Sequence, residues 1–262
     1  FEIKTPMTSY HEYNKIEKGR KLVERLLSGE NIALITDAGM PGISDPGEEL
    51  VKMCYDAGVA VTAVPGASAC ITALVLSGLS TRRFAFEAFL PAEKKERKSI
   101  LTELKDETRT MIIYEAPHRL LRTLEELYET MGERKITVCR ELTKRHETAF
   151  TTTLKEACSY YRAQEPKGEC VLVIEGKSRQ ELKEEAQARW DDMSVKEHME
   201  YYESQGIGRK EAMKLVAKDR GAGKRDIYKA LLEQREEEGN GELISEEHLQ
   251  KVSRRRCCGF RF

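Results

Sequence analysis

The sequence predicts an α/β protein with two α/β domains, followed by a small helical C-terminal extension. Strand-length apolar runs alternate with segments of helical periodicity as far as residue 176, and only helical patterns follow. With 262 residues, 40% of them hydrophobic, the chain can bury more than one core. We expect domains at 1–82 and 83–176, a linker at 177–190, a helical region at 191–235 and a flexible tail at 236–262.

The first domain is predicted to contain a β-α-β unit flanked by helices. Apolar residues recur at helical spacing between Lys15 and Leu27, and Ser28-Gly29 closes that segment as a C-cap does. The charge-free helix that ends this half is expected to be buried on most sides. The predicted elements are helix 15–27, strand 32–36, a helix from Pro46 to Gly58, strand 59–64 and helix 69–76.

The second domain is predicted to hold a mixed sheet covered by helices. Its expected elements are strand 84–89, helix 94–104, strand 110–114, helix 117–128, and strands 136–139, 148–153 and 170–174. Residues 177–187 are charged enough for a linker or a solvated helix, and helices 195–202, 209–219 and 224–233 follow. The last two, joined by Arg220-Gly221-Ala222-Gly223, have the proportions of a helix-turn-helix.

Composition and charge disfavour a disulfide-linked, metal-binding or membrane-spanning protein. The formal net charge of -1 hides local segregation, since residues 31–79 carry almost no positive charge while 94–98 and 251–256 are basic. Seven cysteines without a C-x-x-C pair indicate reduced, cytosolic thiols, and the His and Cys residues show no metal-ligand spacing. No apolar run reaches membrane-spanning length and no signal peptide is visible, although the chain starts at Phe1.

The loop that follows strand 32–36 is the strongest candidate for a ligand site. It contains Asp37 and Asp45 among glycines and prolines, and no Lys or Arg lies between Asn31 and Val51. Such a loop repels polyphosphates and suits a ligand with ribose hydroxyls and a positive charge, as S-adenosylmethionine has. A second turn of small residues, 64–69, should lie beside it, although both turns can also be purely structural connections.

Two polar clusters follow other predicted strands. Residues 115–119 gather an acid, an imidazole and a guanidinium at a helix start, which is also what caps and ion pairs look like. Residues 140–147 form a second cluster, or a solvated loop. The basic segment 94–98 is either a solvated helix face or, with Arg82 and Arg83, a surface for a phosphate backbone.

Six motifs in order make the chain similar to the tetrapyrrole (corrin/porphyrin) methylase family. They are Ser9-Tyr10-His11-Glu12, residues 37–47, Val64-Pro65-Gly66-Ala67-Ser68-Ala69, Phe89-Leu90-Pro91, residues 114–119 and residues 140–147. Within the family the chain resembles the members that methylate the 2'-oxygen of a cytidine ribose in 16S rRNA of the small ribosomal subunit. The resemblance extends over most of 9–176 and to the helical end, while the family's first strand and glycine loop would precede residue 1.

The resemblance implies S-adenosylmethionine folded between two α/β domains, a homodimer, a cytoplasmic location, and no metal or membrane. Residues expected to line the cofactor site are Asp37, Ala38, Gly39, Pro41, Ser44, Asp45, Pro65, Gly66, Ala67, Ser68 and Tyr114. Candidates for the general base are Glu115, His118, Glu141, His146 and Glu147, with His11 and Glu12 as further options. Expected RNA contacts are His11, Lys94, Lys95, Arg97, Lys98, Arg119, Arg140, Lys144 and Arg145, and the helical region 191–235 is also expected to contact RNA.

Two other functions remain open from the sequence. One is a methyltransferase of the same family that acts on a tetrapyrrole or another small acceptor, against which the basic segment and helical C-terminus argue. The other is a nucleic-acid-binding protein without catalysis, which would need no cofactor.

Overall fold

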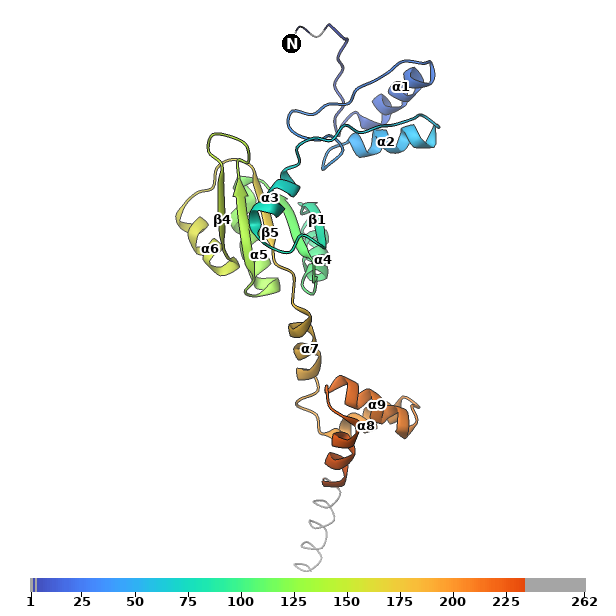
Figure 1. Ribbon diagram of the computed structural model, residues 1–262, viewed down its shortest axis with the longest axis vertical. Coiled ribbons are helices and arrows are strands. Elements are labelled where there is room, and N and C mark those ends of the chain that lie inside the picture. The colour runs from blue at the N-terminus through green and yellow to red at the C-terminus, as the bar shows by residue number, and fades with distance from the viewer. Residues whose placement is uncertain (1, 3, 234–262) are drawn as a thin grey trace, which may run out of the picture. The chain divides into compact units, whose positions relative to one another are not determined.

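The computed structural model describes residue 2 and residues 4–233 (Figure 1). The chain divides into two compact units, Phe1–Lys177 and Ser178–Phe262. The predicted tail at 236–262 lies outside the described residues, as do Cys257 and Cys258. The domain boundary expected at 82/83 stays a prediction.

The chain begins with a small helical core. Helices α1 (Lys15–Leu27) and α2 (Gly47–Asp56) pack through Leu22, Val23 and Leu50. Alternate residues of the two extended segments pack against the same core: Ile32, Leu34, Val59 and Val61. The predicted alternation of apolar residues is therefore present in both segments.

The predicted strands 32–36 and 59–64 are nevertheless wrong. Neither segment forms a ladder with any described residue. Their outward side chains are open to solvent, with Ile35 72% and Val64 81% exposed. A strand needs an aligned neighbour for its backbone groups, and no described segment supplies one, so the predicted β-α-β unit does not form here.

A five-stranded mixed sheet follows, with strand order β1-β2-β5-β3-β4. Strands β1 and β2 pair in parallel, and the other neighbours pair antiparallel, which confirms the predicted mixed sheet. The strands are β1 (Phe84–Phe89), β2 (Thr110–Glu115), β3 (Lys135–Arg140), β4 (Thr148–Thr153) and β5 (Cys170–Ile174).

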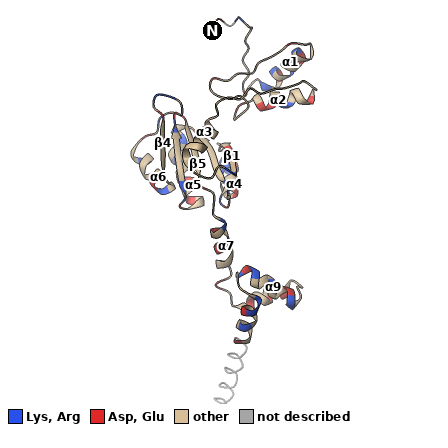
Figure 2. Ribbon diagram, in the orientation of Figure 1, with Lys and Arg blue, Asp and Glu red and all other residues tan. Residues whose placement is uncertain are grey.

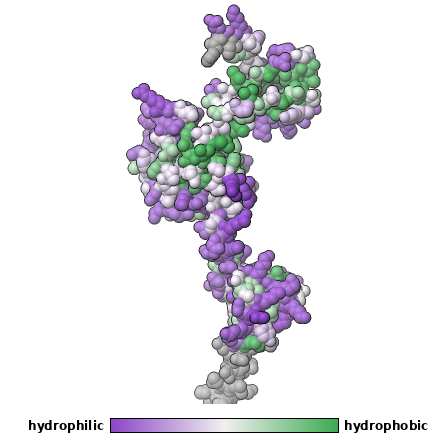
Figure 3. Space-filling model, in the orientation of Figure 1, coloured by the Kyte–Doolittle hydropathy of each residue, from purple (hydrophilic) through white to green (hydrophobic). Residues whose placement is uncertain are grey.

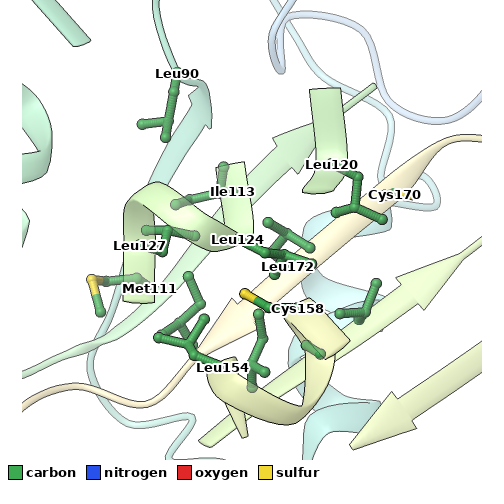
Figure 4. Close-up of a cluster of buried hydrophobic side chains, with 14 of the residues drawn as sticks. Leu90, Met111, Ile113, Leu120, Leu124, Leu127, Leu154, Cys158, Cys170 and Leu172 are labelled. Carbon is green, nitrogen blue, oxygen red and sulfur yellow. The ribbon is translucent and has the colours of Figure 1, made fainter. Parts of the chain in front are cut away.

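The main core lies between one face of this sheet and three helices, α4 (Lys94–Leu104), α5 (Pro117–Met131) and α6 (Leu154–Ala163). Leu120, Leu124 and Leu127 of α5 point into it (Figure 4). Helix α6 is absent from the sequence prediction. Thr153 caps it by accepting a hydrogen bond from the Glu156 backbone nitrogen, and burial of its apolar face against the sheet stabilises it.

Helix α3 (Ala69–Ser77) covers the opposite face of the sheet. Cys70, Ala73 and Leu74 pack on sheet residues, but Val75 is 68% exposed, and Ile71 and Leu76 are also open. The expectation that this helix is buried on most sides is therefore wrong, because the described residues cover only one of its faces. Figure 3 shows hydrophobic surface gathered over α3.

The second unit is helical, as predicted. Its core joins Met199, Val216 and Ile227, and α7 buries no residue, as expected of a solvated helix. The unit contains α7 (Arg179–Ala188), α8 (Val195–Ser204), α9 (Arg209–Asp219) and a helix over 224–233.

Three further observations concern the described residues alone. Their cysteines are free and buried. In this part of the chain, no group of three His, Cys, Asp or Glu side chains is placed to hold a metal ion. None of the described helices combines the length and apolar character needed to cross a bilayer.

Candidate functional site

The register of the sheet brings the two polar clusters to one edge. Cys170, the first residue of β5, pairs with Glu115 of β2 on one side and with Arg140 of β3 on the other. The ends of β2 and β3 therefore lie two strand spacings apart, roughly 10 Å. Phe89 of β1 pairs with Tyr114, so the 89–91 motif reaches the same edge.

The two turns predicted to form the cofactor site are in contact. The Met40 amide donates a hydrogen bond of 2.9 Å to the Ala67 carbonyl. Gly39 has a φ of +82°, and a Cβ added there would lie 2.9 Å from the same carbonyl oxygen. Only glycine meets both conditions without strain, so Gly39 lets the first turn approach the second. The expected closeness of the turns is confirmed.

Tyr114 joins the second turn to the sheet edge. Its phenolic oxygen accepts a hydrogen bond of 3.1 Å from the Cys70 amide, in the first turn of α3. Its ring packs edge-on against Phe86 and Phe89, with centroids 5.0 and 5.7 Å away. Burial first of all, and then Cys70, raises the pKa of Tyr114 to about 12. The hydroxyl therefore stays neutral at ordinary pH.

Asp45 and Asp37 play different parts in the first loop. Both carboxylate oxygens of Asp45 are occupied, by the Gly42 amide at 2.8 Å and the Gly47 amide at 2.7 Å. Asp45 thus shapes the loop, in which Ser44 takes a left-handed φ of 61°. Asp37 is exposed and has no hydrogen bond or ion pair with another described residue.

The other expected cofactor residues lie in these two turns. Ala38 and Gly39 accept hydrogen bonds from the Thr36 hydroxyl through their carbonyls, both at 3.2 Å. Ser68 lies 3.0 Å from the Cys70 sulfur. Pro41 is half-buried, while Pro65, Gly66 and Ala67 are exposed.

Glu115 is closed off from solvent, with a side chain 0% exposed. It accepts hydrogen bonds from the Thr123 hydroxyl at 2.5 Å and from the Ala116 amide at 2.9 Å. Arg119 approaches it to 3.4 Å and donates to the Leu90 carbonyl at 2.8 Å. Every direction of approach to this carboxylate is therefore taken, which disfavours Glu115 as a base and favours a role in positioning Arg119.

Arg97 is part of the same buried network, and its prediction as an RNA contact is wrong. The residue is 3% exposed. Its guanidinium donates to Glu126 at 2.5 Å and to Thr123 at 2.7 Å. On a helix that packs against a neighbour, a run of consecutive residues turns some of its members inward, and here Arg97 faces α5. Lys94, Lys95 and Lys98 remain exposed. Figure 2 shows the blue of Lys and Arg on α4.

The 140–147 loop is organised by its own acids. Glu141 has a φ of 51° and accepts hydrogen bonds from the Glu169 amide and from Lys144, at 3.0 and 3.1 Å. These contacts, the backbone one first, lower the pKa of Glu141. Glu147 accepts from the Thr143 amide at 2.5 Å. Both carboxylates therefore accept hydrogen bonds that hold the loop in place. The lowered pKa also makes Glu141 a weak base.

The remaining predicted residues are accessible to different degrees. His118, Arg145 and His146 are exposed and have no hydrogen bond or ion pair with other described residues. Arg140 is half-buried and donates to the Lys167 carbonyl at 3.0 Å. His11 lies before α1, where the Asn14 amide nitrogen is 3.1 Å from its ring.

Some residues at this edge are missing from the sequence prediction. Gly168 has a φ of 82°, and a Cβ there would lie 2.4 Å from the Glu141 side chain. Cys70 supplies the amide that binds Tyr114, and Thr123 holds Glu115. The turn Pro166-Lys167-Gly168 just before a buried strand is the one signal that pointed to this region.

Comparison with known proteins gives three consistent matches. The family model described as Tetrapyrrole (Corrin/Porphyrin) Methylases matches residues 2–158. A Bacillus subtilis (strain 168) protein named "Ribosomal RNA small subunit methyltransferase I" is 47% identical over 230 residues, covering 88% of this chain and 78% of that protein. A Synechocystis protein of the same name is 42% identical, covering 89% and 82%.

Among solved structures, the methyltransferase CobJ is similar in fold. Its TM-score is 0.50 at 17% sequence identity, and the match covers 65% of this chain and 74% of that one.

Proposed function

We propose that this chain, which belongs to the tetrapyrrole (corrin/porphyrin) methylase family, transfers a methyl group from S-adenosylmethionine to the 2'-oxygen of a cytidine ribose in 16S rRNA. The main support is the set of relatives at 42 to 47% identity that are named for methylation of small-subunit ribosomal RNA. These names lend no support to a tetrapyrrole acceptor or to a protein without catalysis.

The residues of the joined turns suit the proposed methyl donor. The stretch between Asn31 and Val51 has acids and no base, and Asp37 is exposed without a partner among the described residues. A free carboxylate can accept ribose hydroxyls or face a positive charge. The contact of Met40 with Ala67 gives two backbone segments that can hold one flat ligand. When bound, S-adenosylmethionine supplies a methyl group activated by its sulfonium charge, which the ribose oxygen takes as it loses its proton.

His118 is the best candidate for the proton acceptor. It lies in the first turn of α5, directly after β2, and is exposed. Glu115 is sealed, and Glu141 and Glu147 are occupied by their own loop. His146 is the second candidate, across the same sheet edge. Histidine is the side chain that most often acts as a general acid or base in enzymes.

The sheet edge also carries the cations that would position RNA. Arg119 follows β2, Arg140 ends β3, and the loop after β3 adds Lys144 and Arg145. The exposed lysines of α4 are Lys94, Lys95 and Lys98. Phosphate contacts of this kind fix the register of the substrate while the reacting ribose is aligned.

Two further expectations extend the proposal. A homodimer is supported by the open apolar side chains Ile71, Val75 and Leu76 of α3, since monomers seldom leave such a face uncovered. Light scattering of the wild type and of Val75→Glu tests it, with a dimer expected only for the wild type. A substrate in the small ribosomal subunit would place the activity in the cytoplasm.

The acceptor is tested directly by offering methyl-labelled S-adenosylmethionine with three alternatives: small subunits lacking the modification, naked 16S rRNA, and a reduced tetrapyrrole. Label in rRNA supports the proposal. Label in the tetrapyrrole alone contradicts it, and cofactor binding without any transfer rejects both acceptors. His118→Asn should lower kcat strongly and leave the dissociation constant of S-adenosylhomocysteine unchanged.

A further inference from the structure

The charges of the second unit are segregated along its sequence. Residues 178–206 hold eight acidic and four basic residues, whereas residues 207–233 hold eight basic and four acidic ones. Helix α9 and the helix over 224–233 therefore form a basic half, and α7 and α8 form an acidic half. Segregation of this kind creates a local field that the total charge of the unit does not reveal.

Two charged side chains of the basic half, those of Asp219 and Arg220, form hydrogen bonds inside the unit and do not contribute to its outer surface. Arg220 donates to the ring of His198 at 3.2 Å and to the backbone of Ser194 at 3.2 Å. Asp219 accepts a hydrogen bond of 2.5 Å from Tyr202. Without this inward pair the half keeps seven basic and three acidic residues, so its net positive charge is unchanged.

The helix over 224–233 buries Ile227 and Leu231 and turns a different face outward. Arg225, Tyr228, Lys229 and Leu232 stand at spacings of three and four on that outer face. Tyr228 is 55% and Leu232 is 42% exposed. Arg225 has no hydrogen bond or ion pair with a described residue, and Lys229 has one acidic neighbour, Glu233, at 3.6 Å. Cations thus flank an open aromatic ring on one helix face.

Helix α9 adds a line of lysines to the same half. Lys210, Lys214 and Lys218 recur every four residues and are exposed. Of these, Lys214 is paired with Glu211 at 2.6 Å, while Lys210 and Lys218 make no ion pair with described residues.

We propose that the basic half of the second unit, centred on the outer face Arg225, Tyr228, Lys229 and Leu232, binds single-stranded RNA of the substrate. This inference rests on the proposed function, because it takes the acceptor to be RNA. Positive charge complements the phosphate backbone, and an exposed ring beside it offers a platform on which a base can stack. An acidic protein segment would use the cations but would not need the ring, so RNA is the occupant that accounts for both.

The test compares two double variants of the full chain that remove the same charge. Arg225→Ala with Lys229→Ala alters the outer face, and Arg179→Ala with Lys183→Ala alters an equally spaced pair on the acidic half, in α7. All four residues are exposed, and alanine favours helix, so both proteins should fold with wild-type circular dichroism. The measured quantity is the dissociation constant for a single-stranded 16S rRNA fragment at several salt concentrations.

We expect the outer-face variant to bind RNA about tenfold more weakly and to lower the slope of log affinity against log salt by about 1.4, since each single-strand phosphate contact contributes about 0.7. The α7 variant should keep the wild-type slope. Tyr228→Ala should weaken binding about tenfold with an unchanged slope, and Tyr228→Phe should bind as the wild type does. Equal slopes for the two double variants would overturn the proposal, as would equal affinities of Tyr228→Ala and Tyr228→Phe.

Because RNA binding is measured directly, this test can fail or succeed independently of the test of the proposed function. If the wild type methylates rRNA and the outer-face variant has unchanged RNA affinity, only this inference fails. If no methyl transfer to rRNA occurs, the proposed function fails, and the binding comparison still decides whether the face holds RNA.

Discussion

The amide of Cys70 donates a hydrogen bond of 3.1 Å to the phenolic oxygen of Tyr114, across 44 residues of sequence. This bond ties the first turn of α3, which directly follows the second proposed cofactor turn, to the end of β2, near His118 and Arg119. It is a direct link between the region proposed to hold the methyl donor and the region proposed to hold the acceptor.

Tyr114→Phe should loosen this link while keeping the ring packing. Loss of one hydrogen bond costs on the order of 1 kcal/mol, so we expect about fivefold weaker binding of S-adenosylhomocysteine by calorimetry. Tyr160→Phe is the control, because Tyr160 is 41% exposed and its hydroxyl has no hydrogen bond in the described part of the chain. Equal affinities of the two variants would remove Tyr114 from the cofactor site.

The two aspartates of the first loop should separate binding from folding. Asp37→Asn removes a free carboxylate, so cofactor affinity should fall about tenfold with no change in melting temperature. Asp45→Ala breaks the hydrogen bonds to Gly42 and Gly47, so both affinity and melting temperature should fall. Calorimetry and thermal unfolding measure the two effects. A lowered melting temperature for Asp37→Asn would show that its carboxylate supports the fold.

Gly168→Ala should disrupt the 140–147 loop. The new methyl group would lie 2.4 Å from the Glu141 side chain at a φ of 82°. Gly206→Ala is matched, since Gly206 has a φ of 81° with open space around its added Cβ. We expect Gly168→Ala to lose more stability in urea unfolding and more affinity for RNA than Gly206→Ala. Removing the clash in a Gly168→Ala, Glu141→Ala double variant should recover part of the stability, and failure to do so would contradict a steric cause.

Acid should destabilise the second unit through His198. The ring is 0% exposed, stacks on Trp190 at 3.8 Å and accepts a hydrogen bond from Arg220. Burial first, and then Arg220, lowers the pKa of His198. The unfolded chain therefore binds the proton more readily, so stability is complete above pH 6.5 and is lost as the pH falls toward the folded pKa.

Trp190 is the only tryptophan of the chain and reports this transition by fluorescence. We expect the urea concentration at the midpoint of unfolding to decrease when the pH is lowered from 7.5 to 5.5, both in the wild type and in His118→Asn. His198→Gln should unfold at lower urea but with a flatter pH dependence. An equally steep dependence in His198→Gln would assign the titration to another group.

Local patterns predicted the central sheet well. Strands 84–89, 148–153 and 170–174 have the observed bounds, because short runs of β-branched and aromatic residues favour strands. The segments at 32–36 and 59–64 have the same alternation but no neighbour among the described residues. A sequence pattern reports which side chains face a core, whereas a ladder depends on a second segment that the pattern does not contain.

The sequence predicted which segments form the candidate site. It did not predict the role of each residue in them, because that role depends on tertiary contacts. Glu115 and Arg97 read as accessible charges within polar motifs, yet α4 and α5 bring them into one buried network. The partners of Arg97, which are Thr123 and Glu126, lie 26 and 29 residues away in the sequence, so only the packing of α4 on α5 reveals them. The contact between Met40 and Ala67 was anticipated because both turns follow apolar segments of the same pattern.

The central claim is methylation of a ribose oxygen in 16S rRNA, and mass spectrometry of the RNA tests it most directly. Unmodified small subunits would be incubated with the chain and S-adenosylmethionine, and the rRNA would then be digested to nucleosides. We predict 2'-O-methylcytidine, which depends on both the chain and the methyl donor. A methyl group on a base, or no methylated nucleoside while the chain binds the donor, would contradict the account.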